Sequence, residues 1–213
     1  TMIDSMPWHA QAWVEFARRH GMDIDVPDLM ARTTGKNGTE CIVELLGRPV
    51  SQAEADALTH EKETIYRELF APRFAEVAGF RQFAAQVHSR GIKVAVGTAG
   101  DIGNVEFALG HLGLAPAPLA IVRGDEGLPG KPQPAIFLEA ARRIGADPAH
   151  CIVFEDAPFG IEAARRAGMR AVAICSTHTP EQLAGPHVLA AVRDYTELMN
   201  TDFLESIHVA ATA

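Results

Sequence analysis

Short apolar runs alternate with amphipathic segments through the last two-thirds of the chain. Runs rich in β-branched residues predict strands, and apolar residues at helical spacing predict helices. The apolar runs predict strands at residues 92–97, 119–122, 151–154 and 171–175, with a weaker edge strand at 188–192. The amphipathic segments predict helices at residues 80–89, 104–112, 134–144 and 158–167. Continuous apolar strands separated by helices are typical of a parallel sheet covered on both faces.

The first third of the chain has a different pattern, with helical periodicity and no convincing strand between residues 8 and 78. Trp8, Ala12 and Phe16, for example, can share one face of a helix. Glycines and prolines divide this segment into roughly four helices. The breaks are expected at Gly21, Pro27, Gly35 with Gly38, and Gly47 with Pro49.

The two patterns together predict an α/β protein with a doubly wound parallel-sheet core and an inserted, all-helical cap domain. We assign residues 1–7 and 79–213 to the core and residues 8–78 to the cap. Such a core should have a strand before the helical segment, but only Thr1–Ile3 precede it here. The first strand of the core is therefore expected to be truncated in this chain.

The composition narrows the classes of partner and location. The 213 residues carry 19 Lys and Arg against 27 Asp and Glu, a net charge of −8. Nucleic acids and anionic membranes are recognised by basic surfaces, so we expect neither as the main partner. The three cysteines are far apart and form no CxxC pair, which predicts buried free thiols and a reducing, cytoplasmic location. No apolar run approaches the roughly 20 residues of a membrane span, and no heptad pattern indicates a partner subunit, so we expect a monomer.

Chemically active side chains follow several of the predicted strands. Thr98 and the pair Glu155–Asp156 come directly after strands, and Lys131 lies in a turn-rich loop after another. Because the carboxyl ends of parallel strands meet at one edge of a sheet, where ligands bind, these side chains are expected to converge. Adjacent carboxylates suit Mg²⁺, which prefers oxygen ligands. Lys131 could neutralise a phosphate oxygen, and the Thr98 hydroxyl could donate to one.

Each of these residues also has a purely structural explanation. Asp156 could cap the helix that begins near Pro158, and Thr98 could cap the helix that follows it. Lys131 could be a solvated loop lysine, as most loop lysines are. Spacing alone leaves these alternatives open.

Four segments of the chain carry a set of motifs in a fixed order. The chain opens with Thr1–Ser5 (TMIDS), Thr98 ends VAVGT, Lys131 lies in GKPQPAIF, and Glu155–Asp156 precede the segment GIEAARRAG. In order and spacing these resemble the motifs of the haloacid dehalogenase-like (HAD) superfamily, in its β-phosphoglucomutase-like phosphatase branch. The corresponding family motifs are DxDGT(L/M)(I/V)DS, a strand ending in Ser or Thr, a lysine in GKPxPxxF, and an ED pair followed by G-x-x-A-A-x-x-A-G.

The resemblance implies a reaction and a role for each matched residue. In the family, the first Asp of DxD attacks phosphorus to form an aspartyl phosphate, and the second acts as general acid and base. By resemblance, Asp156 would bind Mg²⁺ directly and Glu155 directly or through water. Thr98 would hydrogen-bond the phosphoryl oxygens, with Ala99 beside it as a substrate contact. Lys131 would hold the nucleophile and the phosphate together.

The chain departs from the family at its first motif, because neither aspartate of DxD is present. Asp4 aligns with the aspartate of the family's DS and is not expected to be the nucleophile. We expect about ten further residues upstream of Thr1, forming the first strand and ending in DxDG, by analogy with the family's nucleophile arrangement. Without them, the chain is predicted to be inactive.

The cap keeps some features of the mutases in this branch. His9 matches a histidine that acts in proton transfer and phosphate binding, and Lys62 matches a sugar-recognising lysine. A polar linker residue and a solvated helix charge are the respective alternatives. Lys36 and Asn37, in the next cap loop, are expected to contact substrate as well.

Two other mutase features are missing. Gly38 lies where mutases carry a phosphate-binding arginine, and Asp101 lies where they use Ser-Lys for the second phosphate. An acid beside a dianion should cost roughly 1 kcal/mol or more. This favours Mg²⁺-dependent hydrolysis of a small phosphomonoester, such as a sugar phosphate. A phosphosugar mutase is the alternative, and a non-catalytic binding protein that has lost its nucleophile is an alternative of another class.

Overall fold

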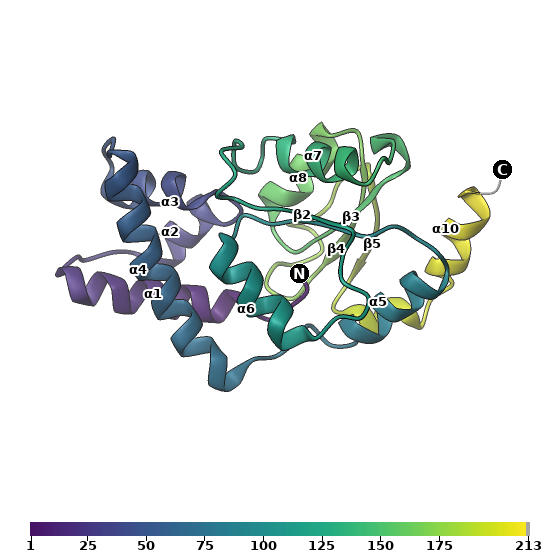
Figure 1. Ribbon diagram of the computed structural model, residues 1–213, viewed down its shortest axis with the longest axis horizontal. Coiled ribbons are helices and arrows are strands. Elements are labelled where there is room, and N and C mark those ends of the chain that lie inside the picture. The colour runs from purple at the N-terminus through teal and green to yellow at the C-terminus, as the bar shows by residue number, and fades with distance from the viewer. Residues whose placement is uncertain (212–213) are drawn as a thin grey trace.

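The computed structural model describes residues 1–211 and forms two lobes (Figure 1). The cap lobe contains α1 (Met6–His20), α2 (Val26–Thr33), α3 (Gly38–Leu46) and α4 (Gln52–Phe70). The rest of the chain alternates strands with helices and forms the core lobe, and the N-terminus lies near the middle of the molecule (Figure 1). An α/β core with a helical cap confirms the predicted fold class.

Local sequence sets the bounds of the cap helices. Gly21 ends α1 in the left-handed conformation, at φ 63°, which glycine adopts without steric cost. Asn37 and Glu40 form a capping box at the start of α3. Pro27, predicted as a break, lies instead in the first turn of α2, where its missing N–H would have no helical partner anyway. The apolar faces of the helices meet around the fully buried Phe16 and give the cap its own core.

Short parallel strands form at the predicted apolar runs. They are β1 (Ala95–Gly97), β2 (Ala120–Val122), β3 (Ile152–Glu155), β4 (Arg170–Ile174) and β5 (Val188–Val192). β1 pairs with β2, and β4 pairs with both β3 and β5, in parallel throughout. Ala171 and Ala173 of β4 pack into one apolar cluster while Val172 and Ile174 pack into the other. This strand is therefore buried on both faces, as its continuous apolar pattern predicts.

Helices cover both faces of the core. They are α5 (Phe80–Ser89), α6 (Ile102–Leu112), α7 (Ala135–Arg143), α8 (Pro158–Arg166), α9 (Tyr195–Met199) and α10 (Phe203–Ala211), with 3₁₀ turns at Ala71–Arg73 and Pro148–His150. α7 and α8 pack on one face, while α5, α9 and α10 pack on the other (Figure 1). The prediction missed α9 and α10.

The two sheets face each other across an apolar slot. Within the described residues, β1 is hydrogen-bonded only to β2 in this region, and β3 only to β4. Side chains from α5, β1 and β3 line the cavity between them, among them Phe83, Val96 and Phe154. Thr1 lies at the end of this slot, against the last residue of β3.

Two adjacent segments connect the lobes. Ile3 and Glu76 form an antiparallel bridge, and the backbone N–H of Asp4 donates to the carbonyl of Ala75 at 3.0 Å. The connections into and out of the cap therefore run side by side, as a two-stranded hinge requires. None of the helices described is both long enough and apolar enough to cross a lipid bilayer.

The three cysteines are free thiols, as predicted. They are half-buried, however, and not fully buried as expected.

Candidate active site

The predicted catalytic residues meet at the carboxyl ends of two strands. Thr98 directly follows β1, Glu155 is the last residue of β3, and Asp156 follows it. All three line a cavity of about 2160 Å³ that extends between the cap and the core, and so does Lys131. The strand-end argument predicts such a shared cavity, and the catalytic roles of these residues stay a prediction.

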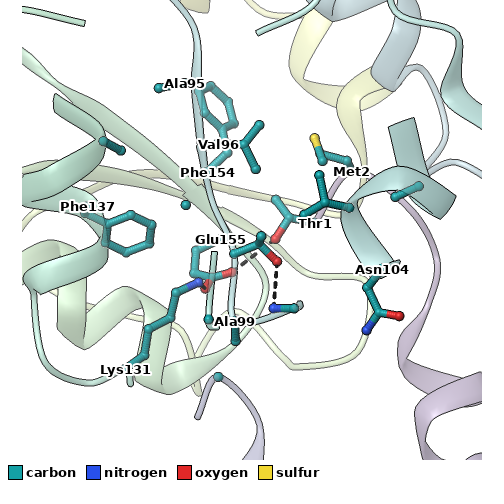
Figure 2. Close-up of a pocket in the computed structure, with 18 of the residues that line it drawn as sticks. Thr1, Met2, Ala95, Val96, Ala99, Asn104, Lys131, Phe137, Phe154 and Glu155 are labelled. Carbon is teal, nitrogen blue, oxygen red and sulfur yellow. Dashed lines mark hydrogen bonds and ion pairs between the residues drawn. The ribbon is translucent and has the colours of Figure 1, made fainter. Parts of the chain in front are cut away.

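Lys131 and Glu155 form a buried ion pair at the centre of this site. The Lys131 Nζ lies 2.6 Å from Oε1 of Glu155 and 4.8 Å from the centroid of the Phe137 ring. Figure 2 shows Lys131 reaching Glu155 from the side of Phe137, with Thr1 on the opposite side of the carboxylate. Because both charged groups are buried, each depends on the other for compensation. Lys131 is thus a fixed charge at the site and not a solvated loop lysine.

Asp156 is a buried carboxylate that contacts Thr1. Its Oδ1 accepts a hydrogen bond of 2.5 Å from the Thr1 hydroxyl, and its Oδ2 lies 3.2 Å from the Thr1 α-ammonium. On the backbone side, Nδ1 of His178 donates to the carbonyl of Asp156 at 2.9 Å. The residue is therefore held through both its side chain and its backbone carbonyl.

The structural alternative for Asp156 is wrong. The N-cap of α8 is Ala157, and no side chain caps this helix. Gly160, in the first turn of α8, instead makes room for the neighbouring carboxylate, because a Cβ there would lie 1.8 Å from Oε1 of Glu155. The glycine of the fourth motif thus lets the helix pack directly against the acidic pair.

Thr98 lies in the short loop between β1 and α6. Its N–H donates to the carbonyl of Val122, and its hydroxyl oxygen accepts from the N–H of Gly100 at 3.1 Å. It is not the N-cap of α6, which is Asp101. Ala99 is locked by close backbone contact, because a Cβ on Gly124 would come within 2.0 Å of its carbonyl oxygen. The loop is therefore fixed by its own backbone.

The acidic pair fits a hard divalent cation. Within residues 1–211, no group of three or more His, Cys, Asp and Glu side chains is arranged to hold a metal. Mg²⁺ commonly binds through one or two carboxylates and completes its shell with water and phosphate oxygens. Glu155 and Asp156 supply such oxygens at the cavity.

The cap contributes a second buried cluster. Lys62 is buried, and its Nζ lies 2.8 Å from Nδ1 of His9 and 2.8 Å from Oε1 of Glu63. The His9 ring stacks on Tyr66 with the centroids 3.8 Å apart. Burial, together with the charge of Lys62, lowers the pKa of His9 to about 3. His9 is therefore neutral, with Nδ1 as acceptor and the proton on Nε2.

The two residues predicted in the cap loop are turned towards other protein groups. The Lys36 Nζ lies 2.7 Å from Oε1 of Glu44 within the cap. Asn37 caps α3, and its side-chain nitrogen is 3.5 Å from the carbonyl of Leu128 in the core. Both residues line the cavity, so their role in substrate contact stays a prediction.

The argument from the charge of Asp101 needs correction. Its Oδ1 accepts from the N–H of Asn104 at 2.8 Å and lies 3.8 Å from Nη1 of Arg67. The carboxylate is thus compensated by the start of α6 and by a cation, and is not a bare charge facing a phosphate.

Sequence analysis missed two residues that line the cavity, Glu63 and Asn104, and two that contact site residues, Arg67 and His178. The sequence carried a usable pattern for only one pair of these residues, Glu63 and Arg67. Glu63 and Arg67 have the spacing that puts two side chains on one face of a helix. Their partner in the core is about 40 positions away, which no local pattern reveals.

Comparison with known proteins gives consistent relatives. The sequence matches the family of haloacid dehalogenase-like hydrolases over residues 1–168. It is 36% identical over 176 residues to the fructose-1-phosphate phosphatase YqaB of Escherichia coli (strain K12), covering 81% of this chain and 90% of that protein. It is 31% identical over 183 residues to β-phosphoglucomutase of Bacillus subtilis (strain 168), covering 81% of this chain and 78% of that protein. The solved structure of a hydrolase from Pseudomonas syringae is similar with a TM-score of 0.83 at 25% identity, covering 97% and 94%.

Proposed function

The chain belongs to the haloacid dehalogenase-like hydrolase family, and we propose that it is a Mg²⁺-dependent phosphatase acting on a small phosphomonoester, such as a sugar phosphate. The observation that carries this proposal is the convergence of Thr98, Lys131 and Asp156 on one cavity. A hydroxyl donor, a fixed cation and a buried carboxylate are the groups that phosphoryl transfer needs around one phosphorus.

Each residue has a defined task in this proposal. Asp156 holds the metal, with Glu155 beside it. When bound, Mg²⁺ neutralises charge as an anionic nucleophile approaches the phosphoryl group. Thr98 donates its hydroxyl to a phosphoryl oxygen. Lys131, already oriented by Glu155 at 2.6 Å, supplies a positive charge that is in position before the substrate arrives.

We place the nucleophile on a strand that would fill the slot between β1 and β3. Both strands run parallel to their partners and end at the site, and their facing edges are unpaired within the described residues. A DxDG segment at the end of a strand in the slot would bring its first aspartate next to Asp156. Turnover through an aspartyl-phosphate intermediate is expected to require this segment.

The cap side of the cavity supports hydrolysis of a monophosphate over mutase chemistry. A mutase must bind both phosphates of a bisphosphate, which needs cations at two places. The basic side chains Lys36, Lys62 and Arg67 are paired with the carboxylates of Glu44, Glu63 and Asp101, respectively. This supports an uncharged, hydroxyl-bearing leaving group, as in the sugar phosphate named for the E. coli relative.

Phosphate release from a panel of phosphomonoesters, by a protein that carries a DxDG strand in the slot, tests the proposal. Activity should require Mg²⁺ and should fall to background with a chelator. Asp156→Asn, which keeps the shape and removes the charge, should lower the rate at least about a hundredfold. Undiminished release in the presence of chelator would contradict the assigned role of Asp156.

The same assay separates the alternatives. A mutase would interconvert isomeric sugar phosphates and release little inorganic phosphate. A non-catalytic binding protein would do neither, even with a DxDG strand in the slot.

A further inference from the structure

The cap and core are joined by a side-chain contact that catalysis as described leaves unexplained. Asn104, in the first turn of α6, projects into the cavity (Figure 2). Its amide nitrogen donates to Oε2 of Glu63 at 2.7 Å, and its amide oxygen accepts from Nη1 of Arg67 at 2.9 Å. Glu63 and Arg67 lie one turn apart on α4. One core side chain is therefore held by two cap side chains.

The chemistry of the three groups allows only one arrangement. An ionised carboxylate only accepts, and a guanidinium only donates, so the amide of Asn104 must present its nitrogen to Glu63 and its oxygen to Arg67. Although burial opposes ionisation, Lys62 and the adjacent hydrogen bonds lower the pKa of Glu63 to about 2. Glu63 therefore stays an acceptor.

The surface of α6 is shaped to admit the cap. Gly103 lies under the guanidinium, and a Cβ there would be 3.0 Å from Nη1 of Arg67. On its other side, Arg67 lies 3.8 Å from the carboxylate of Asp101, which caps α6. The contact thus reaches the helix that begins four residues after Thr98.

A second contact reaches the other phosphate-binding segment. Oε1 of Glu40, at the start of α3, accepts from the N–H of Gly130 at 3.1 Å. The approach is close, because a Cβ on Gly130 would lie 2.0 Å from Oε2 of the same carboxylate. Gly130 directly precedes Lys131. Both contacts therefore touch a segment that carries a predicted phosphate ligand.

We propose that Asn104 is a positioning residue, whose clasp by Glu63 and Arg67 holds the cap closed and sets the Thr98 loop for phosphate binding. The expected effect of Asn104 on phosphate binding rests on the proposed phosphatase function. The clasp itself needs no catalysis and can be measured without it.

A donor–acceptor swap tests the clasp. Asn104→Asp places a carboxylate against that of Glu63 and should open the cap. The double variant Asn104→Asp with Glu63→Gln has the net charge of the original and restores the hydrogen bond with its direction reversed. Hydrogen–deuterium exchange of the 213-residue chain is the readout, over the first turn of α6 and the connection at residues 71–77.

The single variant should exchange about tenfold faster in these segments, and the double variant should recover most of the original protection. Arg67→Met, a change at a partly exposed position, should reproduce the faster exchange if Asn104→Asp does not fold. Two results would overturn the proposal. One is that Asn104→Asp and Arg67→Met both exchange at the rate of the original protein. The other is that the double variant exchanges no more slowly than the single variant Asn104→Asp.

Steady-state kinetics tests the catalytic effect of the clasp. In a protein that releases phosphate, Asn104→Asp should lower kcat/KM about tenfold and the swap should restore it. A purely structural residue would not be rescued by reversing the hydrogen bond. A protein that carries a DxDG strand in the slot and has the exchange pattern, but releases no phosphate, would refute the phosphatase proposal and leave the clasp standing.

Discussion

The buried charged side chains of this protein are concentrated at its cavity. In the described part of the chain, the buried lysine and carboxylate side chains are those of Lys62, Lys131, Glu155 and Asp156, and all four line the cavity. Buried ion pairs contribute little to stability compared with apolar packing, so such residues are a poor choice for holding a fold together. Their concentration at one place is instead typical of a functional site.

Removing one partner of the central pair should destabilise the protein. Lys131→Met leaves the Glu155 carboxylate buried without its cation, at a cost of about 3–5 kcal/mol. The double variant Lys131→Met with Glu155→Gln removes both charges and should cost less than the single variant. Urea unfolding without Mg²⁺ measures both. Equal destabilisation of the two variants would show that the pair is not the source of the loss.

The neutral state of His9 makes stability depend on pH. Its folded pKa of about 3 lies below the ordinary value of 6.5, so below pH 6.5 the unfolded chain binds a proton that the folded chain does not. Stability therefore falls as pH decreases from 6.5, by at most about 1.4 kcal/mol per pH unit from this group. Glu63, with its pKa lowered from 4.5 to about 2, adds to the loss below pH 4.5.

His9→Gln separates these two contributions. Between pH 6.5 and 4.5 the variant should show a shallower fall in the free energy of unfolding than the original protein. The difference should persist to about pH 3, the folded pKa of His9, and only below that pH should the two slopes become similar. An unchanged slope above pH 4.5 would mean that His9 is not held neutral.

At the scale of elements, the strands and the main helices follow from local pattern. The predicted strand at 188–192 and helix at 80–89 coincide with β5 and α5. α9 spans only Tyr195–Met199 and begins at a side-chain cap on Asp194. A helix this short has too few repeated apolar positions for a helical periodicity to be recognised in the sequence. Its existence depends on packing Tyr195 into the core, which is a tertiary effect.

The site was predictable where it is built from strand ends. Thr98, Glu155 and Asp156 follow apolar runs, and topology brings such positions together. The clasp on Asn104 was not predictable, because its partners belong to another lobe and meet it only when the cap is closed. The compensation of the Asp101 charge by Arg67 was not predictable for the same reason, because Arg67 lies in the cap.

Packing between α8 and β3 should be sensitive to a single methyl group. Gly160→Ala would force the Glu155 side chain from its position, since the added Cβ would overlap it. We expect weaker Mg²⁺ binding by calorimetry and a loss of roughly 1–3 kcal/mol of stability.

Gly110→Ala is the matched control for this substitution. Gly110 lies in α6 with nothing within 4 Å of an added Cβ, and it should gain up to about 1 kcal/mol from helix propensity. Similar effects of the two substitutions would contradict the packing argument.

At the scale of the molecule, the site exists only where the lobes meet. The core provides Thr98, Lys131 and the acidic pair, and the cap closes over them through Asn104 and Gly130. The apolar slot between the sheets continues from this site into the core. The cap contacts, the predicted phosphate ligands and the position proposed for the nucleophile therefore all lie along one continuous cavity.

Mg²⁺ should stabilise the whole protein. A ligand at a hundredfold excess over its dissociation constant adds about 2.7 kcal/mol, which corresponds to a rise in Tm of roughly 5–11 °C at this chain length. Asp156→Asn should abolish the rise. An equal rise in this variant would place the cation elsewhere.

The position of the cation is the most direct test of the account. Crystals of the protein soaked in Mn²⁺ would locate the ion by its anomalous scattering. We predict a peak at coordination distance, about 2.1–2.3 Å, from a carboxylate oxygen of Asp156, at the end of the cavity shared with Thr98 and Lys131. A strong peak at another site with none at Asp156 would contradict the central claim.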